Sequence, residues 1–362
     1  MNKIILFETK EDCCGCQACY EVCPNQAIEW KQDEEGFYYP QINYKKCVSC
    51  KKCLNVCPLK NRNINKEKVL CFGGQNKNMK IRESSSSGGL FSVFAQAILN
   101  SAGSVFAVGF DSNLQVKHME ITEIKELDRV RRTKYVQSDI NHTYSLIQSR
   151  LKKQKWVLFV GTPCQAQALI NYLNKKYERL IIIDLICYGV PSPGIWEDYI
   201  YQISKKNKIL NFNFRDKRNH NNGHTVSWNT KKQEHVHPLM QDTFSKLYFQ
   251  NLIIRPSCHS CPFTQIDRNS DITLGDFWGI EKVNSKFNDG MGNSLIILHS
   301  KKAREMWEKV KINCKFFSCT KEDILQPRLK EPTPRSKNRN RFMKLYKNLP
   351  FPILYYLYSI RK

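Results

Sequence analysis

The chain carries one cysteine pattern twice near its N-terminus, as DCCGCQACYEVCP at residues 12–24 and as KCVSCKKCLNVCP at residues 46–58. Each stretch contains the spacing C-x2-C-x2-C-x3-C-P. Three cysteines at this spacing can surround one cuboidal 4Fe-4S cluster only from a tight loop, whereas the fourth lies beyond the loop and reaches the other cluster. The two stretches therefore predict a pair of 4Fe-4S clusters in this N-terminal segment.

Each cluster is expected to take three cysteines from one stretch and the fourth from the other. The first set is Cys13, Cys16, Cys19 and Cys57, and the second set is Cys47, Cys50, Cys53 and Cys23. Zinc sites instead favour two cysteine pairs separated by a longer spacer. Cys14 falls outside the register and is expected to be a bystander thiol. The pattern is that of a bacterial dicluster ferredoxin of βαββαβ type, which relays single electrons.

Composition places the remainder of the chain among globular cytoplasmic proteins. The chain has 362 residues, of which 41% are apolar, and this is enough for two or three domains. It lacks a run of about eighteen uncharged apolar residues, and its start, MNKIILFETKEDCC, lacks the order of a signal peptide. In a reducing cytosol, the 16 cysteines are better explained by metal ligation than by disulfides.

The formal net charge of +24 indicates an acidic partner, an acidic substrate or an anionic membrane surface. The two clusters would lower this charge without reversing it. Nucleic acid is disfavoured as a partner, because the basic residues are spread along the chain and no DNA- or RNA-binding motif accompanies them.

A loop of small residues opens the second part of the chain. Residues 59–70, LKNRNINKEKVL, are polar and basic and are expected to form a linker. The run SSSSGG at 84–89 then precedes the segment LFSVFAQAIL, whose apolar pattern predicts a helix. Amides at a helix N-terminus attract phosphate, so this loop is suited to the pyrophosphate of a flavin dinucleotide. A flexible linker with a helix cap is the alternative.

A strand–helix–strand unit follows this loop. The runs WVLFV and LIIIDLI are typical of buried strands, and the segment AQALINYLNKK between them has a helical pattern. Cys164 and Cys187 then lie past the carboxyl ends of two parallel strands, where open α/β sheets bind ligands. Cys258 and Cys261 form a further C-x2-C pair, which alone would suit a zinc half-site or a redox dithiol. Together the four cysteines predict a third 4Fe-4S cluster.

Several separated blocks resemble, in the same order, the beta-subunit family of coenzyme F-420 hydrogenases and dehydrogenases, in its bacterial form with a fused dicluster ferredoxin. The resemblance covers residues 1–330, and coincidence is a poor explanation for so many ordered blocks. The blocks are SSSGGLF at 85–91, TKYVQS at 133–138, GTPCQ at 161–165, DLICYGVPSP at 184–193, FRDK at 214–217, CHSCPF at 258–263 and SDITLGDFWG at 270–279.

The resemblance implies an oxidoreductase core that contains FAD and holds its own 4Fe-4S cluster on the same four cysteines. The flavin would convert between one-electron traffic on the clusters and a hydride step with a substrate or a deazaflavin. By matching position, the flavin neighbours are expected to be Ser86, Gly88, Gly89, Thr133, Lys134 and Tyr135. Lys134 is also a candidate catalytic residue, and an ordinary surface lysine is the alternative.

Two segments depart from the family pattern. Arg131 and Arg132 stand directly before Thr133 and Lys134, where the family pattern is expected to have small residues that include glycine. The later segment RNHNNGHTVSW is longer and richer in histidine than the family pattern, so it is a candidate determinant of substrate specificity. His220 and His224 are candidate acid or base groups, because imidazole titrates near neutral pH. Solvated loop histidines are the alternative.

The C-terminal segment SKNRNRFMKLYKNLPFPILYYLYSIRK combines basic residues with aromatic and aliphatic ones. Such a segment can lie on an anionic membrane surface, which would make the protein peripheral to the inner face of the membrane. A helix packed on the domain or on a partner is favoured, because Pro350 and Pro352 interrupt the helical pattern. Cys71, Cys314 and Cys319 lack partner spacing and are expected to be buried or unpaired thiols.

Together these observations predict an α+β fold, with a bacterial dicluster ferredoxin-like domain followed by a larger α/β flavin- and cluster-binding domain. The expected boundaries are 1–66 for the dicluster domain, 67–150 and 151–330 for the two parts of the flavin domain, the second carrying the third cluster, and 331–362 for the tail. The expected function is electron transfer between the clusters and FAD. The expected partner is an acidic redox protein such as ferredoxin, an anionic deazaflavin or a partner subunit. A non-catalytic electron-relay subunit is the alternative.

Overall fold

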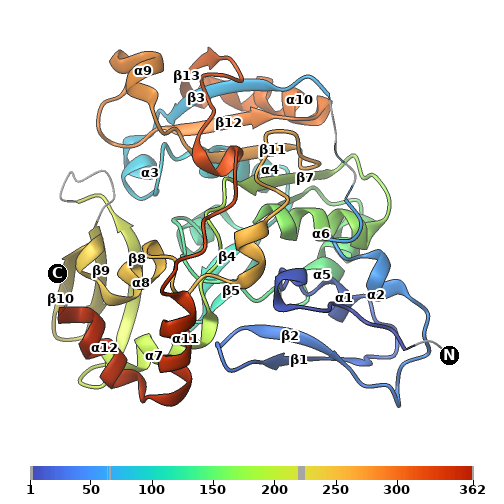
Figure 1. The fold of residues 1–362 in the computed structure, drawn as a ribbon. Coiled ribbons are helices and arrows are strands. Elements are labelled where there is room, and N and C mark those ends of the chain that lie inside the picture. The colour runs from blue at the N-terminus through green and yellow to red at the C-terminus, as the bar shows by residue number, and fades with distance from the viewer. Residues whose placement is uncertain (1–2, 63, 65–66, 219–224, 361–362) are drawn as a thin grey trace.

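The computed structural model describes residues 3–62, 64, 67–218 and 225–360. Its N-terminal region, blue in Figure 1, lies at one corner of the molecule beside helices α5 and α6. The remainder is organised around an eight-stranded sheet and a separate three-stranded sheet. The α+β fold with a small N-terminal region and a larger α/β part is therefore confirmed.

Two cysteine loops and one hairpin make up the N-terminal region. Each loop enters a one-turn helix through a residue in the left-handed conformation, which is Gln17 in one loop and Lys51 in the other. Asp33 closes the hairpin by accepting hydrogen bonds from the backbone N–H groups of Glu35 and Phe37. The elements are η1 (Lys10–Asp12), α1 (Ala18–Glu21), β1 (Ile28–Gln32), β2 (Tyr38–Ile42) and α2 (Lys52–Asn55).

The described residues of this region contain the inner part of the expected βαββαβ ferredoxin fold, in the order α1, β1, β2, α2. Among its described residues, the antiparallel pair β1–β2 is the only sheet. The flanks of the cysteine loops are taken up by tight turns, because η1 ends directly before Cys13 and a turn begins at Pro58 directly after the second loop. The start of the chain is held instead by the hydroxyl of Tyr44, which donates to the carbonyl of Ile4 at 2.9 Å.

The large sheet has the strand order β13-β3-β12-β11-β7-β6-β4-β5. Its four central strands, from β11 to β4, run parallel, and the outer strands on both sides pair antiparallel. The central strands are near-continuous apolar runs, as expected for strands that are covered on both faces. The strands are β3 (Leu70–Asn76), β4 (Ser104–Phe110), β5 (Val116–Ile121), β6 (Val157–Gly161), β7 (Leu180–Leu185), β11 (Ile272–Asp276), β12 (Ser294–Leu298) and β13 (Cys314–Cys319).

Helices cover both faces of this sheet. Leu158 packs with α4 and α10 on one face, and its neighbour Phe159 packs with α5 and α6 on the other. The predicted strand–helix–strand unit is confirmed as β6–α6–β7, and Pro163 starts α6 next to a capping box of Thr162 and Gln165. The helices are α4 (Leu90–Asn100), α5 (Thr143–Lys152), α6 (Pro163–Leu173) and α10 (Lys301–Val310).

A second core lies under the three-stranded sheet, where aromatic side chains such as Trp196, Phe212 and Phe244 pack together. The C-terminal tail, red in Figure 1, forms two helices that add the buried Phe342 to this core. The tail is therefore packed on the domain, as favoured from the sequence. The elements are α7 (Pro193–Ser204), β8 (Ile209–Asp216), β9 (Thr225–Thr230), β10 (Glu234–Pro238), α8 (Thr243–Phe249), α11 (Arg339–Asn348) and α12 (Phe351–Ile360).

Short elements connect these layers. They are η2 (Ile124–Arg129), η3 (Leu239–Gln241), η4 (Pro256–Ser260), η5 (Ser285–Phe287), η6 (Lys311–Asn313), η7 (Pro327–Leu329), α3 (Met79–Glu83) and α9 (Ile280–Asn284). In the part of the chain that the structure describes, no helix has the length and apolar character needed to cross a membrane.

Candidate functional site

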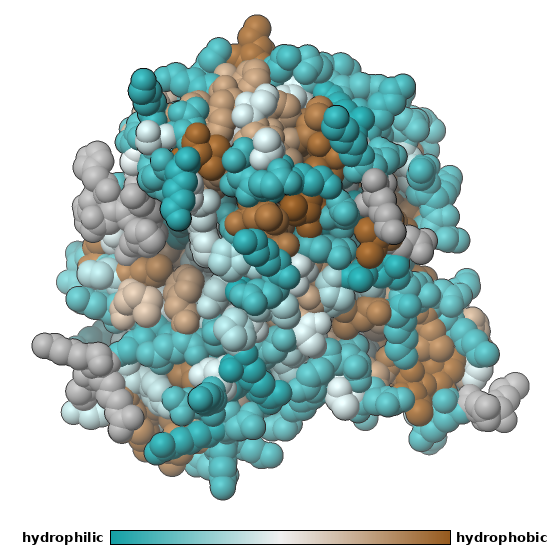
Figure 2. Space-filling view, turned by 45° about the horizontal axis from the view of Figure 1, so that its top comes forward, coloured by the Kyte–Doolittle hydropathy of each residue, from teal (hydrophilic) through white to brown (hydrophobic). Residues whose placement is uncertain are grey.

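The second cysteine set lies at the surface of the N-terminal region. Its four members, Cys23, Cys47, Cys50 and Cys53, line one open pocket. Val48, which lines the same pocket, is 60% exposed, and Ile5 is 58% exposed. Figure 2 shows apolar side chains gathered at this end of the molecule, at the lower right. The cross-assignment of Cys23 to the second stretch is supported by this shared pocket.

The first cysteine set is enclosed between the N-terminal region and the large sheet. Cys16 is buried and packs with residues of α5 and α6. The sulfur of Cys57 lies close enough to interact electrostatically with Cys13, Cys16 and Cys19. This neighbourhood supports the assignment of Cys57 to the first set.

The third set comes together from three separate segments. Cys164 lies in the first turn of α6, Cys187 follows β7, Cys258 lies in η4 and Cys261 follows η4. The sulfur of Cys258 interacts electrostatically with the other three sulfurs. Burial, with a contribution from neighbouring sulfurs, raises the pKa of Cys187 to about 12 and that of Cys261 to about 11.

These sulfur sets fit the chemistry of 4Fe-4S clusters. Four neighbouring thiols cannot easily all lose their protons, because their negative charges repel one another. Bound iron offsets that cost by neutralising the thiolates. The N–H of Gly189 donates to the sulfur of Cys187 at 3.4 Å, and the N–H of Gly15 interacts with Cys13 in the same way. Among the residues described, no three metal-binding side chains converge on a site for a single ion. A four-iron cluster instead spreads its thiolates over four irons.

Cys14 joins the first and third sets. Its sulfur lies near that of Cys16 of the first set and near that of Cys164 of the third. The neighbouring Cys16 raises the pKa of Cys14 well above its usual value, and the neighbouring Cys14 has the same effect on Cys164. The sequence pattern gave this residue no role, because its contact with Cys164 depends on the packing of distant segments.

The Ser/Gly loop at 84–89 leads into α4, as predicted. Gly89 has a φ of +82°, a conformation that glycine adopts at little cost. A Cβ atom on Gly88 would lie 2.4 Å from the carbonyl oxygen of Gly74, so the loop sits tightly against β3. Ser86 accepts a hydrogen bond from the N–H of Thr133 at 2.8 Å. The loop and the 133–138 segment are therefore neighbours, although they are far apart in the sequence.

Cationic side chains surround this loop. The ammonium of Lys217 donates to the carbonyls of Ser87 at 2.5 Å and Met291 at 2.8 Å, and that of Lys134 donates to Arg131 at 2.8 Å. Burial lowers the pKa of both lysines to about 7. Arg82 pairs with Asp289, but its buried Nε has no hydrogen-bond partner among the described residues.

This donor set fits the diphosphate of FAD. Positive side chains and the N-terminus of an eleven-residue helix face the same loop, and both attract phosphate. The ring of Tyr135 packs against Phe214, Tyr248 and Phe249 and provides an apolar wall next to this charge. Lys217 was part of a sequence block but was not expected to be a site residue.

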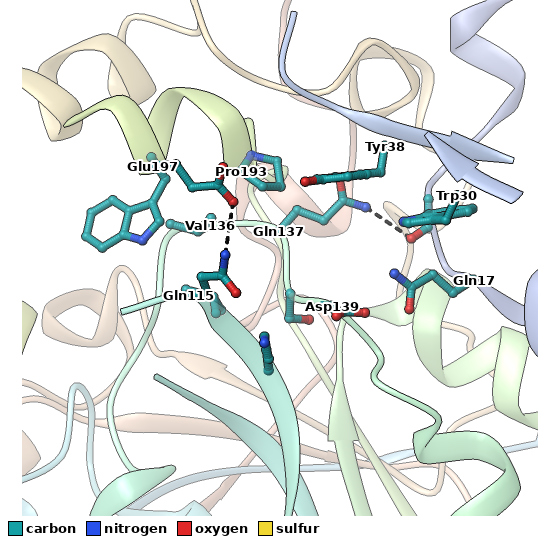
Figure 3. Close-up of a pocket in the computed structure, with 14 residues that line it drawn as sticks. Gln17, Trp30, Tyr38, Gln115, Val136, Gln137, Asp139, Pro193 and Glu197 are labelled. Carbon is teal, nitrogen blue, oxygen red and sulfur yellow. Dashed lines mark hydrogen bonds between the residues drawn. The ribbon is translucent and has the colours of Figure 1, made fainter. Parts of the chain in front are cut away.

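A separate pocket of about 190 Å³ lies where the N-terminal hairpin meets the α/β part, as Figure 3 shows. Trp30 and Tyr38 line it from the hairpin, Gln115 lines it from directly before β5, and Glu197 lines it from α7. Gly15 of the first cysteine loop also lines it. The pocket does not include the expected flavin residues, and it adjoins the first cysteine set instead.

Two parts of the chain match family models. Residues 154–321 match the model that describes the C-terminal part of the beta subunit of coenzyme F420 hydrogenase/dehydrogenase. Residues 12–61 match the 4Fe-4S dicluster domain. The chain therefore joins a region similar to a 4Fe-4S dicluster domain to a region similar to this F420 family. The resemblance stated from its sequence is confirmed.

Known proteins are similar to different parts of the chain. The F subunit of F(420)H(2) dehydrogenase from Methanosarcina mazei is 26% identical over 292 residues, which cover 76% of this chain and 78% of that protein. An uncharacterized ferredoxin of Methanocaldococcus jannaschii is 43% identical over 49 residues, which cover 14% of this chain and 62% of the ferredoxin. A chain in a structure of the F420-reducing NiFe hydrogenase complex from Methanosarcina barkeri has a TM-score of 0.46 and 16% identity, and the match covers 78% of this chain and 90% of that chain.

The expected flavin residues form two groups in the structure. Ser86, Gly88 and Gly89 lie in the Ser/Gly loop and Thr133 contacts it, whereas Tyr135 points into the adjoining aromatic cluster. His220 and His224 lie outside the described residues. The hydrogen bonds of Lys134 go to backbone carbonyls, so its ammonium holds the 129–132 turn.

Proposed function

We propose that this chain transfers electrons between three 4Fe-4S clusters and an FAD that exchanges hydride with a substrate or with a deazaflavin of the coenzyme F420 type. The observation that carries the proposal is the contact of Cys14 with Cys16 and Cys164, which brings two cysteine sets together. When bound, the clusters supply one-electron steps and the flavin supplies the two-electron hydride step.

The three cysteine sets follow one another from the surface inward. Cys53 of the surface set interacts electrostatically with Cys19 of the first set, and Cys14 connects the first set to Cys164 of the third. The third set lies at the carboxyl ends of β6 and β7. This edge is where open α/β sheets bind their ligands. The three cysteine sets are thus arranged in the order surface set, first set, third set.

At the inner end, the Ser/Gly loop is suited to hold the flavin diphosphate. The helix N-terminus and the ammonium of Lys217 would attract the phosphates. Arg82 would offer its unpartnered Nε to them. Tyr135 would orient the apolar part of the ligand by packing.

At the outer end, the surface set is suited to an acidic protein partner. Lys51 and Lys52 are exposed and line the same pocket as the four cysteines. A basic rim around an apolar patch favours a small acidic electron carrier of the ferredoxin class. The Methanosarcina mazei relative is named as part of a dehydrogenase with several subunits, and on that basis a partner subunit is also proposed.

A non-catalytic electron relay is the second candidate. It is favoured by hydrogen bonds that the Ser/Gly loop and the nearby lysines make within the chain. The N–H of Gly88 donates to Ser294 at 3.0 Å, and the ammoniums of Lys134 and Lys217 donate to backbone carbonyls. A relay would take electrons from one protein and deliver them to another without binding a small substrate.

Steady-state kinetics with the anaerobically reconstituted, full-length chain separates the two candidates. Reduced coenzyme F420 serves as electron donor and methyl viologen as acceptor, with FAD present. The enzyme proposal predicts turnover by the isolated chain and none without FAD. Turnover that begins only after a partner protein is added would favour the relay.

A further inference from the structure

Arg255 connects two cysteine sets through one residue. It directly precedes η4, which carries Cys258, and its carbonyl accepts a hydrogen bond from the N–H of Cys258 at 3.0 Å. Its own N–H donates to Val190, three residues after Cys187, at 2.9 Å. The backbone of Arg255 therefore belongs to the third set, and its side chain is 0% exposed.

The guanidinium of Arg255 extends from there into the first set. Its Nε donates to the carbonyl of Cys13 at 2.7 Å, and its Nη2 lies 3.6 Å from the sulfur of the same residue. Nη2 also donates to the carbonyl of Tyr38 at 3.1 Å, and Nη1 donates to Oε1 of Gln137 at 2.9 Å. The guanidinium lies 4.2 Å from the ring centre of Tyr39.

Among the described residues, no carboxylate forms an ion pair with the guanidinium of Arg255. Two other buried arginines each form an ion pair, Arg268 with Asp184 and Arg339 with Glu35. The partners of Arg255 in the described part of the chain are carbonyl oxygens, an amide oxygen, aromatic rings and a sulfur. A buried cation is costly unless an anion compensates it. A thiolate-ligated cluster on Cys13 is an anion at the required place.

Gly15 and Gln137 hold the guanidinium against the first cysteine loop. A Cβ atom on Gly15 would lie 2.3 Å from Nε2 of Gln137 and 2.7 Å from Nη1 of Arg255, so a side chain there would displace both groups. Nε2 of Gln137 donates to the carbonyls of Cys14 and Gly15. Figure 3 shows the side chain of Gln137 at the pocket beside the hairpin residues Trp30 and Tyr38.

We propose that Arg255 sets the reduction potential of the cluster on the first cysteine set. Reduction adds one negative charge to the cluster, and a fixed buried cation at the Cys13 sulfur stabilises this more negative state. The potential of the first cluster is therefore raised relative to a chain that lacks the guanidinium. The inference rests on the first cluster of the proposed function, and it does not depend on FAD or on the substrate.

Redox titration followed by electron paramagnetic resonance tests this role on the full-length, reconstituted protein. Arg255→Met removes the charge and is expected to lower the reduction equilibrium constant of the first cluster by at least about tenfold, equivalent to ~59 mV for one electron. Arg255→Lys keeps the charge and is expected to restore more than half of the shift. The potential of the surface cluster on Cys23, Cys47, Cys50 and Cys53 is an internal control that is expected to stay unchanged.

Two further variants complete the test. Gln137→Glu is close in shape to the native side chain and places an anion beside the guanidinium, so it is expected to lower the same potential even if Arg255→Met fails to assemble its clusters. Arg339→Met removes another buried arginine and is expected to leave the first potential unchanged. An unchanged first potential in Gln137→Glu, or in an iron-replete Arg255→Met, would overturn the proposal. If the wild-type chain binds neither a third cluster nor FAD after reconstitution, the proposed function is rejected. The redox titration of the first cluster can still be interpreted in that case.

Discussion

The three cysteine sets lie in two contrasting environments. The second set lines an open pocket with exposed Val48 and Cys50, at the edge of the N-terminal region. The first and third sets are enclosed between that region and the large sheet, and they share Cys14 and Arg255. Exposure favours exchange with an external carrier, whereas burial with shared residues favours rapid transfer inside the chain. In the proposed function, this difference in burial separates the cluster that exchanges electrons with a partner from the clusters that deliver them inside the chain.

The largest effect is expected at the buried end. Cys261→Ser removes one ligand of the third set and is expected to lower the iron content by about four atoms per chain, the content of one cluster. Substrate reduction is expected to be abolished, with the two N-terminal clusters retained. Iron analysis with electron paramagnetic resonance checks this result. Cys314→Ser is the matched control, because Cys314 is buried outside all three sets. A Cys261→Ser variant with full activity would contradict the role of the third set.

A smaller effect is expected at the Ser/Gly loop. Lys217→Gln removes one charge-assisted contact, worth roughly 1.5–3 kcal/mol, and so weakens FAD binding about 10- to 100-fold. Flavin fluorescence during titration of the apoprotein measures this affinity. Lys302→Gln is the control, since the ammonium of Lys302 likewise binds two backbone carbonyls, of Tyr177 and Leu180. Equal FAD affinity in both variants would place the flavin elsewhere.

The pH dependence of FAD binding sharpens the same comparison. Burial lowers the pKa of Lys134 and Lys217 to about 7, so both ammoniums are charged below that pH and lose their proton above it. FAD carries anionic phosphates, and its affinity is expected to fall as the pH rises through 7, by up to about tenfold per unit for each lysine that must be charged. Titrations at pH 6 and pH 8 measure the change. An affinity that is constant over this range would contradict the contribution of the lysines.

The smallest effect is expected at the surface set. The double variant Lys51→Glu and Lys52→Glu reverses charge beside the open pocket. It is expected to slow association with an acidic ferredoxin by about tenfold at low salt, and high salt is expected to remove the difference. Stopped-flow kinetics measures the rate. Lys301→Glu, on α10 with an 88% exposed side chain, is the control for net charge. Equal rates in the control and the double variant would exclude docking at this pocket.

The sequence predicted the cysteine sets and the strand–helix–strand unit because these depend on local spacing. It did not predict Arg255, Gln137 or Lys217 as site residues, because their contacts join segments more than a hundred residues apart. The same limit applies to Cys71 and Cys319. No cysteine motif in the sequence links them, yet they lie opposite each other on β3 and β13. Of the expected βαββαβ ferredoxin, the described residues contain the inner part from α1 to α2, and no outer strand is found among them.

The most direct test of the central claim is the content of iron, acid-labile sulfide and FAD per chain after anaerobic reconstitution. The account predicts about twelve iron atoms, the sum of three four-iron clusters, together with one FAD. About eight iron atoms and no flavin would leave only the N-terminal clusters standing. That result would contradict the buried third set and the flavin site, and it would make the electron relay the better description of this chain.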